Sequence, residues 1–253
     1  MIQPGLVSIT YRQLSVDQVI EVSTQAGIAG IEWGGDIHVP HGDLDTASVT
    51  AQKTSDAGLQ VSAYGSYYRA GHDDEVSAET VVASAQKLGA PTIRIWAGKQ
   101  GSADASPEYA GQVAADCRRI AALAADVGIK IALEWHGNTL TDNATAATEL
   151  FAAVKHPNLY AFWQPRVNAN VAANLVDMQS ALPHVIGLHV FNWHEKTVER
   201  LPLSEAEAAW AQYLDRAPTD IDMFASLEFV PQDDPTLLAR EAATLRTWLE
   251  TRA

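Results

Sequence analysis

Short apolar runs alternate with longer amphipathic stretches along the chain. The short runs are bounded by turn-forming residues, as buried strands are, whereas the longer stretches repeat their apolar residues with helical spacing. Some helical stretches start at a capping residue such as Ser15 or Asn143, and several end at a glycine such as Gly27, Gly89 or Gly128. The pattern therefore predicts repeated strand-to-helix units and a parallel sheet.

The pattern divides into eight such units. The predicted strands cover Leu6–Ile9, Gly30–Trp33, Gln60–Tyr64, Thr92–Trp96, Lys130–Glu134, Leu159–Trp163, Val185–Val190 and Asp222–Phe229. The predicted helices cover Ser15–Gly27, Leu44–Ala57, Glu75–Leu88, Pro107–Val127, Asn143–Val154, Ala169–Leu182, Ser204–Leu214 and Pro235–Leu249. Eight units close a (β/α)₈ TIM barrel of the α/β class. An open doubly wound sheet is the alternative, but its G-x-G-x-x-G signature is missing after the first predicted strand.

Composition and charge narrow the class of protein. The chain has 253 residues, 47% of them hydrophobic, and no composition shift marks a linker, so we expect one barrel domain over residues 1–253. The 17 basic residues face 31 acidic ones, which disfavours nucleic acid as a partner. The single cysteine, Cys117, excludes an internal disulfide. Neither a signal peptide nor a membrane-spanning run is evident, so we expect a cytoplasmic protein with no membrane partner.

Four predicted strands in the second half of the chain run into a metal-capable side chain. These side chains are Glu134, Gln164, His189 and Glu228. Because the carboxyl ends of barrel strands meet at one rim, we expect the four to converge on one metal site. Two carboxylates, an amide oxygen and an imidazole favour one divalent ion, with Mn²⁺ preferred and Mg²⁺, Co²⁺ or Zn²⁺ as alternatives.

Each of these residues also has an ordinary structural explanation. Glu134 can pair with Arg94 inside the barrel, and Gln164 can hydrogen-bond a loop. His189 can be a core histidine whose ring nitrogens are satisfied, and Glu228 can be a charge at the rim. The joint metal interpretation is favoured because two carboxylates at the ends of apolar runs are costly to bury without a cation or a hydrogen-bond network.

Further polar and aromatic side chains near the predicted strand ends are candidates for substrate binding. They are His38, His136, Arg166, His194, Trp96 and Tyr67. Imidazole and guanidinium groups donate to hydroxyl, carboxylate or phosphate oxygens, and aromatic faces can stack on a sugar ring. For His38, the preceding Gly34-Gly35 pair permits an unusual turn that returns the imidazole to the rim. A salt bridge, a solvated loop or a core position is the alternative for each candidate.

Five stretches carry a resemblance to a known family. They are SITYRQLSVDQVIEVSTQAGIAGIEWGGDIHVP, IALEWHGNTLTD, LYAFWQP, IGLHVFNW and SLEFV. They resemble the sugar phosphate isomerase/epimerase group of the xylose isomerase-like TIM barrels, which also contains ketose 3-epimerases, hydroxypyruvate isomerases, inosose dehydratases and the endonuclease IV type of AP endonuclease. The resemblance covers essentially the whole chain and is specific for the superfamily but not for the reaction.

The resemblance implies roles for the candidate ligands. In the family's epimerases a Glu, an Asp, a His and a Glu after strands five to eight bind one divalent ion. This chain matches at Glu134, His189 and Glu228, whereas Gln164 replaces the Asp and leaves the ligand set one negative charge short. The resemblance also implies that Glu134 and Glu228 remove and return a proton on opposite faces of a carbon next to a carbonyl, through an enediolate that the metal stabilises.

The sequence therefore favours a metal-dependent isomerase or epimerase that acts on a sugar or keto-sugar. A dehydratase or lyase acting on a keto-sugar, keto-inositol or keto-glycoside is the alternative, since it starts with the same proton abstraction. A non-catalytic sugar-binding or partner subunit is a second alternative. DNA repair is disfavoured by the acidic composition and by the lack of a larger metal-ligand cluster. A homodimer is the expected oligomeric state.

Overall fold

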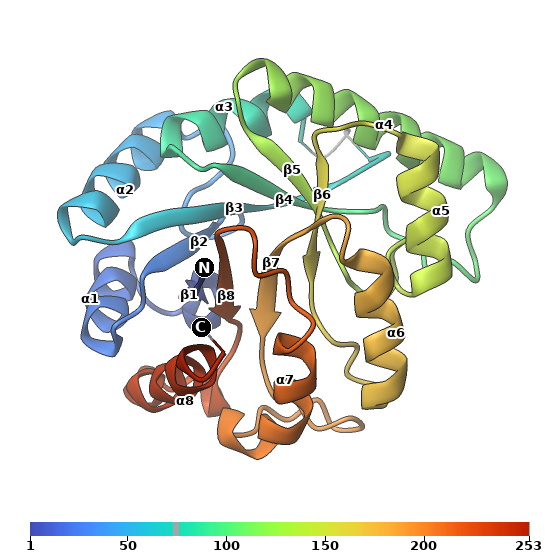
Figure 1. Cartoon of the computed structure of the whole chain (residues 1–253). Helices are drawn as coiled ribbons and strands as arrows, with labels where there is room; N and C mark the ends of the chain where they lie inside the picture. Colours follow the sequence, from blue (N-terminus) through green and yellow to red (C-terminus); the bar gives the residue numbers. More distant parts are fainter. Residues whose placement is uncertain (73–75, 253) are drawn as a thin grey trace.

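The computed structural model of the chain, described here for residues 1–72 and 76–252, is a (β/α)₈ TIM barrel (Figure 1). Its parallel strands are β1 (Ile2–Val7), β2 (Gly30–Gly34), β3 (Gln60–Arg69), β4 (Thr92–Trp96), β5 (Lys130–Glu134), β6 (Leu159–Trp163), β7 (Val185–Val190) and β8 (Met223–Leu227). Each strand pairs with the next in chain order, and β8 pairs back to β1, so the sheet closes without a free edge. The predicted fold class is confirmed.

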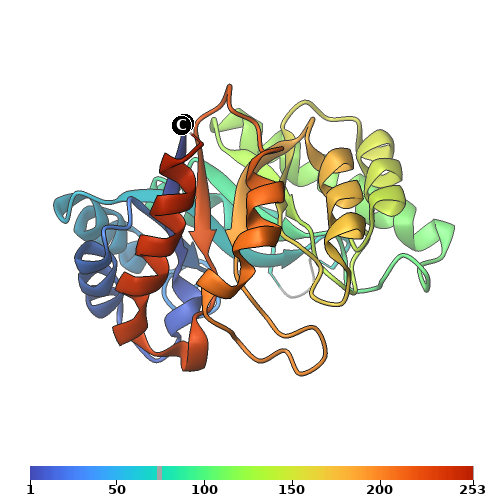
Figure 2. The ribbon, with the colours of Figure 1, turned by 60° about the horizontal axis from the view of Figure 1, so that its bottom comes forward.

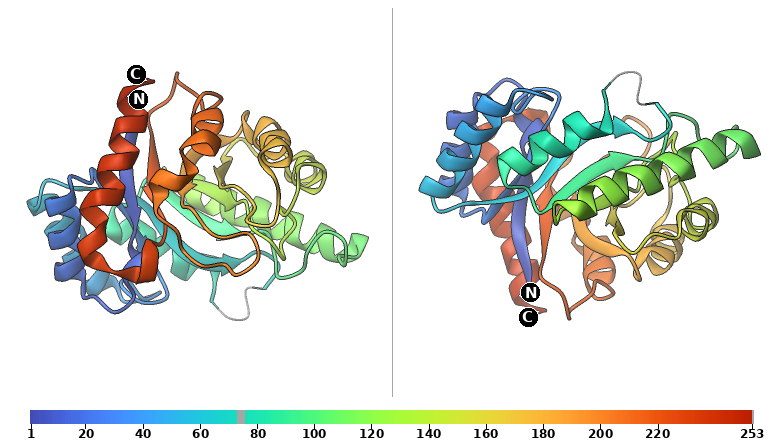
Figure 3. Two further views of the ribbon diagram at one scale, coloured as in Figure 1. Left: turned by 90° about the horizontal axis from the view of Figure 1, so that it is seen from below. Right: turned by 90° about the horizontal axis from the view of Figure 1, so that it is seen from above.

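Helices surround the barrel and bury its outer face (Figure 1). They are α1 (Val16–Ala26), α2 (Leu44–Asp56), α3 (Ala78–Leu88), α4 (Pro107–Asp126), α5 (Ala144–Val154), α6 (Val171–Ala181), α7 (Glu207–Leu214) and α8 (Leu238–Glu250). Short 3₁₀ segments are η1 (Ser8–Tyr11), η2 (Leu203–Ala206), η3 (Pro231–Asp233) and η4 (Pro235–Leu237). The connection between β7 and η2 extends away from the barrel in Figure 2, and both views of Figure 3 place the chain termini side by side.

Local sequence explains where several helices begin and end. Ser15 forms a capping box with Gln18 at the start of α1, and Asn143 accepts a hydrogen bond from the backbone of Ala146 at the start of α5. Gly27 ends α1 with φ at 68°, a left-handed conformation that favours glycine. The predicted start of the third helix at Glu75 lies outside the described residues.

The alternation of side chains along each strand determines which residues face the barrel interior. In β5, Ile131 and Leu133 belong to the large apolar core of the protein, so Glu134 points to the opposite face. The same alternation turns the even-numbered positions of β2, β4 and β8 inward, because their odd-numbered neighbours lie in that core. In β7 the parity is reversed near the strand end: Leu188 and Val190 lie in the core, so His189 points inward. The inward residues near the strand ends are Glu32, Arg94, Glu134, His189 and Glu228.

The prediction for the first strand was wrong in its position. β1 covers Ile2–Val7 rather than Leu6–Ile9, and residues 8–11 form η1. The strand is fixed by its pairing with β8, in register from Ile2 with Met223 to Leu6 with Leu227. Pairing with β8 thus makes Pro4 and Gly5, residue types that favour turns, part of the strand. The two strands are close at Gly5, since a Cβ atom added there would lie only 2.4 Å from the Ser226 hydroxyl oxygen.

Two other strand boundaries also differ from the predictions. β3 runs to Arg69 rather than ending at Tyr64, so Tyr67 and Tyr68 belong to the strand. The register of β3 against β4 shifts between Gly65 and Arg69, and Tyr67 within this irregular stretch has φ at 56°. β8 ends at Leu227, which leaves Glu228 just beyond the strand. Within the described residues, no helix combines the length and apolarity needed to cross a membrane.

Candidate active site

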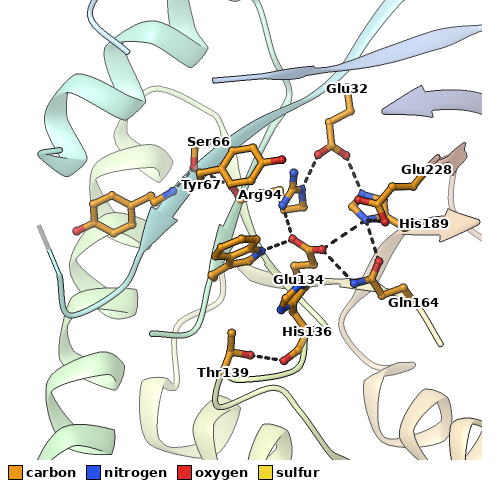
Figure 4. Close-up of polar contacts among 12 residues, drawn as sticks. Glu32, Ser66, Tyr67, Arg94, Glu134, His136, Thr139, Gln164, His189 and Glu228 are labelled. Atoms are coloured by element: carbon orange, nitrogen blue, oxygen red, sulfur yellow. Dashed lines mark hydrogen bonds and ion pairs between the residues drawn. The ribbon is translucent and has the colours of Figure 1, made fainter. Parts of the chain in front are cut away.

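A buried cluster of charged and polar side chains fills the end of the barrel interior where the strands finish (Figure 4). It contains Glu32, Arg94, Glu134, Gln164, His189 and Glu228, contributed by β2 and by β4 to β8 or the residues that follow them. The structure therefore brings together all four predicted metal ligands and adds Glu32 and Arg94.

His189 lies at the centre of the predicted ligand set. Its Nδ1 atom is 3.3 Å from the Gln164 Oε1 atom, 3.6 Å from the Glu228 Oε2 atom and 3.8 Å from the Glu134 Oε1 atom. Glu134, His189 and Glu228 each offer one ligand atom, and these atoms lie within 4.8 Å of one another. One imidazole nitrogen thus shares a small space with three side-chain oxygens.

Arg94 belongs to the same cluster and pairs with two carboxylates. Its Nε donates to the Glu32 Oε1 atom at 2.5 Å, and its Nη1 donates to Glu134. The pairing of Glu134 with Arg94, which the sequence offered as the ordinary explanation, is therefore present together with the cluster. Glu32 was missed, although a carboxylate inside the apolar run Ile31 to Trp33 is the same signal that identified Glu134.

The charged groups of the cluster shift one another's pKa values. Burial raises the pKa of Glu32, but Arg94 and His189 outweigh burial and lower it to about 2. Burial acts against protonation of His189, but Glu228 and Glu32 raise its pKa to about 9. Burial also raises the pKa of Glu228, with Glu134 adding to the effect and His189 opposing it. The pKa of Glu134 is lowered despite burial, mainly by Arg94.

The residues present fit a divalent cation. Three buried carboxylates, those of Glu32, Glu134 and Glu228, face one guanidinium, that of Arg94. This leaves one formal negative charge when His189 is protonated and two when it is neutral, as a metal-binding imidazole is. A buried charge excess of this size is costly unless a cation compensates it. Carboxylate, amide and imidazole donors suit Mn²⁺, Mg²⁺, Co²⁺ or Zn²⁺. Glu134, His189, Glu228 and Gln164 are the residues that would hold the ion.

The two candidate catalytic glutamates have different surroundings. Both carboxylate oxygens of Glu134 accept hydrogen bonds: Oε2 from Arg94 and the Trp96 indole, and Oε1 from the Gln164 amide at 3.0 Å. Among the described residues, no side-chain hydrogen bond to the Glu228 carboxylate is found, and its partner is His189 at 3.6 Å. Glu134 is thus fixed as an anion, whereas Glu228 keeps its lone pairs available.

A cavity of about 770 Å³ opens beside the cluster. Trp96 and His136 stack in its wall with ring centroids 4.8 Å apart, and Tyr67 meets Trp96 edge to face. Burial raises the pKa of Tyr67 to about 12, and its hydroxyl accepts a hydrogen bond from Arg12 at 2.9 Å. The predicted positions of Trp96, His136 and Tyr67 at the pocket agree with the structure.

Arg166 lines the same cavity from the loop after β6. Its Nε donates to the Asp177 Oδ2 atom at 2.6 Å, and its backbone N–H donates to the Asn174 side chain. Asp177 is 3% exposed and also accepts from the backbone N–H of Ala144. The guanidinium of Arg166 is therefore held at one edge by a buried carboxylate on α6.

The two remaining substrate-binding candidates lie outside the residues that line this cavity. His38 is buried, with Nδ1 3.0 Å from the Ser8 hydroxyl and Nε2 3.1 Å from the Leu14 carbonyl oxygen. His194 is exposed in the extended connection after β7, and its Nδ1 accepts from the backbone of Lys196 and Thr197. A substrate contact by either histidine stays a prediction that this arrangement does not favour.

Non-glycine residues in the left-handed backbone region gather at the cavity. Tyr67, Asn138, Val198 and Phe229 all have φ between 52° and 60°, and all four line it. Such conformations cost free energy and persist where the surrounding structure fixes them, which is common at functional sites. Phe229 directly follows Glu228, and its backbone N–H donates to the Thr10 hydroxyl at 2.9 Å.

Comparisons with known proteins agree with the fold. A 3-dehydroshikimate dehydratase of Bacillus anthracis is 28% identical over 166 residues, which span 60% of this chain and 57% of that protein's length. The crystal structure of a probable 3-DHS dehydratase from Bacillus anthracis superposes with a TM-score of 0.80 and 23% identity, covering 97% of this chain and 99% of the other. An L-ribulose 3-epimerase structure superposes with a TM-score of 0.73 and 18% identity, covering 99% and 96%.

The family model described as xylose isomerase-like TIM barrel matches residues 20–248. This match confirms the resemblance that the sequence carries, and the barrel and the buried carboxylate–histidine cluster are consistent with it. The chain belongs to the xylose isomerase-like TIM barrel family.

Proposed function

We propose that this protein is a divalent-metal-dependent dehydratase that removes water from a hydroxylated cyclic ketone carrying a carboxylate. The observation that carries the proposal is the unequal hydrogen bonding of the two glutamates. Glu134 accepts from Arg94, Trp96 and Gln164, whereas Glu228 keeps free lone pairs beside the cavity. A single available base suits a dehydration, in which the same group removes a proton and delivers it to the leaving group. It suits an epimerisation less well, because that reaction needs two equivalent bases.

The chemistry assigned to the chain's own residues is a single proton transfer cycle. Glu228 removes the proton from the carbon next to the carbonyl, and the electron pair of that C–H bond forms a C=C bond as the C–O bond on the neighbouring carbon breaks. The proton then passes from Glu228 to the departing hydroxide, which leaves as water. Polarisation of the substrate carbonyl oxygen is the chemistry that a bound divalent ion supplies.

The other pocket residues would bind and orient the ring of the substrate. Trp96 and His136, which stack on each other with ring centroids 4.8 Å apart, both line the cavity, and aromatic side chains there suit a six-membered ring. Arg166, anchored through its Nε by Asp177, is the proposed partner of the substrate carboxylate, because a fixed guanidinium binds carboxylates with directed hydrogen bonds. The similarity to 3-dehydroshikimate dehydratase makes 3-dehydroshikimate the first compound of this class to test.

Epimerisation or isomerisation of a keto-sugar is the second candidate function. It is favoured by the placement of two carboxylates around one point, since the Glu134 Oε1 atom and the Glu228 Oε2 atom lie 3.8 and 3.6 Å from His189 Nδ1. In that reaction the two glutamates would exchange the proton on opposite faces of the carbon. The hydrogen bonds to Glu134 argue against its acting as a base.

Incubation of the purified protein with Mn²⁺ and 3-dehydroshikimate tests the proposal. We expect an aromatic dihydroxybenzoate to form and its ultraviolet absorbance to rise, with no rise for the Glu228→Gln variant. A parallel set of ketoses in D₂O is examined by NMR. Exchange of a carbon-bound proton in a ketose, without any unsaturated product from 3-dehydroshikimate, would replace the dehydratase by the epimerase.

A further inference from the structure

We infer that Glu32 and Arg94 form a buried brace that positions two metal ligands, His189 and Glu134. The inference rests on the divalent metal centre and therefore on the proposed function. The brace consists of the Glu32 carboxylate and the Arg94 guanidinium, 0% and 1% exposed. In Figure 4, Glu32 lies above His189 and Gln164 lies below it, and dashed lines join Glu32 to both Arg94 and His189.

Glu32 fixes the orientation of His189. The Glu32 Oε2 atom lies 3.0 Å from the Nε2 atom of the imidazole. An ionised carboxylate only accepts hydrogen bonds, so Nε2 carries the proton and Nδ1 faces the three oxygens on the other side of the ring. A histidine ligand typically uses its second nitrogen in this way, and the partner sets both the tautomer and the angle of the ring.

Arg94 connects this contact to the other carboxylate. Its Nε donates to the Glu32 Oε1 atom at 2.5 Å, while its Nη1 donates to the Oε2 atom of Glu134. The guanidinium is planar and rigid, so one side chain fixes both carboxylates relative to each other. Glu134 then turns its remaining oxygen, Oε1, toward Gln164 and His189.

The barrel keeps space for the brace at Gly65 in β3. A Cβ atom at this position would lie 2.7 Å from the Arg94 Nη2 atom and 2.7 Å from the Glu32 Oε1 atom. A glycine is therefore required where the brace passes the strand. Because buried ion networks are often no more stabilising than apolar residues of the same volume, stability alone does not account for this arrangement.

Titration with Mn²⁺ followed by calorimetry tests the brace in the full chain. We expect Glu32→Gln to weaken Mn²⁺ binding by about 10- to 100-fold, the usual effect of removing such a partner. Gly65→Ala keeps every charge but displaces the brace, so we expect weaker binding there too. The absorption spectrum of bound Co²⁺ reports ligand geometry, and we expect it to change in both variants.

Two matched variants control for general damage. Glu241→Gln removes a carboxylate that is 2% exposed, accepts a hydrogen bond from the backbone N–H of Leu203 at 2.6 Å and is not among the residues that line the cavity. Gly30→Ala crowds the barrel interior against the Phe224 ring, 2.6 Å from the added Cβ, but not against the brace. We expect both to bind Mn²⁺ with nearly wild-type affinity and to keep the Co²⁺ spectrum.

The outcomes separate this inference from the proposed function. Wild-type Mn²⁺ affinity and Co²⁺ spectra in both Glu32→Gln and Gly65→Ala would overturn the brace and leave the metal centre intact. A wild-type protein that takes up neither ion would overturn the brace together with the proposed function. If Glu32→Gln does not fold, ¹⁵N NMR of the Zn²⁺-loaded wild type decides: a proton on His189 Nε2 supports the brace, and one on Nδ1 overturns it.

Discussion

Glu134 and Glu228 are chemically identical side chains whose neighbours give them different roles. Arg94, Trp96 and Gln164 donate to Glu134, and these contacts stabilise its ionised form. Burial raises the pKa of Glu228, which lacks comparable donors among the described residues. A carboxylate of the second kind is the better proton acceptor and donor, so we expect Glu228 to serve as the base as well as a ligand, and Glu134 to serve as a ligand alone.

Replacing Glu228 by Gln keeps an oxygen that can face a metal but removes the base. We expect kcat for dehydration to fall by about 10²- to 10⁴-fold, the range that general acid–base groups contribute. Steady-state kinetics measures the fall, and elemental mass spectrometry shows whether the metal is retained. The control is Glu241→Gln, a buried carboxylate remote from the cavity, for which we expect ordinary turnover. Normal kcat in Glu228→Gln would remove Glu228 from the mechanism.

The Arg166→Met variant tests the class of substrate. Removing one charged hydrogen-bonding partner costs about 1.5–3 kcal/mol, which corresponds to a KM that is about 10- to 150-fold higher for a carboxylate-bearing substrate. We expect kcat to change much less, because the contact is made equally in the ground state and the transition state. A neutral cyclic ketone should show no such increase in KM. An unchanged KM for the acid would place its carboxylate elsewhere in the cavity.

At the scale of single elements, the strand ends position the site while the segments after them hold it in place. The turn after β2 is one example. His38 lies there between the Ser8 hydroxyl and the Leu14 carbonyl, and Ser8 also accepts from the backbone N–H of Gly34. The Leu14 carbonyl accepts from Nε2, so Nδ1 is left to accept the Ser8 proton. This neutral imidazole links η1 to the turn after β2.

Removal of this imidazole should change both stability and its pH dependence. Burial lowers the pKa of His38 below its usual value near 6.5. The unfolded chain therefore binds this proton first as the pH falls, and the stabilisation by His38 is complete above about pH 6.5 and declines below it. We expect His38→Gln to lower the free energy of unfolding by about 1–3 kcal/mol at pH 7.5.

Measuring the free energy of unfolding at two pH values isolates the effect of His38. Urea unfolding of the wild type and of His38→Gln is compared at pH 7.5 and pH 5.0. Other titrating groups are common to both proteins, so the difference in free energy of unfolding should shrink at the lower pH. A difference that grows as the pH falls would mean that His38 is charged in the folded protein.

At the scale of the whole molecule, the barrel holds an excess of buried negative charge at one end of its interior. Three carboxylates face the single guanidinium of Arg94 among the described residues of this cluster. The molecule as a whole is also acidic, with a formal net charge of −14, which favours cations near its surface. Binding of a cation should therefore stabilise the whole fold. The expected homodimer and the absence of nucleic acid partners stay predictions.

Mn²⁺ should raise the unfolding temperature of the purified protein. At a free concentration 100 times the Kd, a ligand that binds only the folded state adds about 2.7 kcal/mol to the free energy of unfolding. For a chain of this length that corresponds to roughly 5–10 °C. Differential scanning calorimetry with Mn²⁺ and with EDTA measures the shift, and Ca²⁺ at the same ionic strength serves as a control. Equal unfolding temperatures with Mn²⁺ and EDTA would contradict the metal centre.

The sequence alone determined the order of strands and helices, the closed barrel, and the four side chains that converge on the ligand set. Apolar periodicity and capping residues are local signals, and a carboxylate or imidazole at the end of an apolar run, such as Glu134, His189 or Glu228, is local as well. Eight strand-helix units then imply closure, because consecutive parallel strands joined by helices return to the same rim.

Only the tertiary structure decided the start of β1, the contact between Glu32 and His189, and the place of His38 outside the cavity. β1 is fixed by β8 at the far end of the chain, and Glu32 meets His189 across 157 positions. Such pairings depend on how the closed barrel positions residues from remote strands, which no local pattern encodes. His38 was expected at the rim because the Gly34-Gly35 pair permits an unusual turn, but its hydrogen bonds to Ser8 and Leu14 hold the imidazole outside the cavity lining.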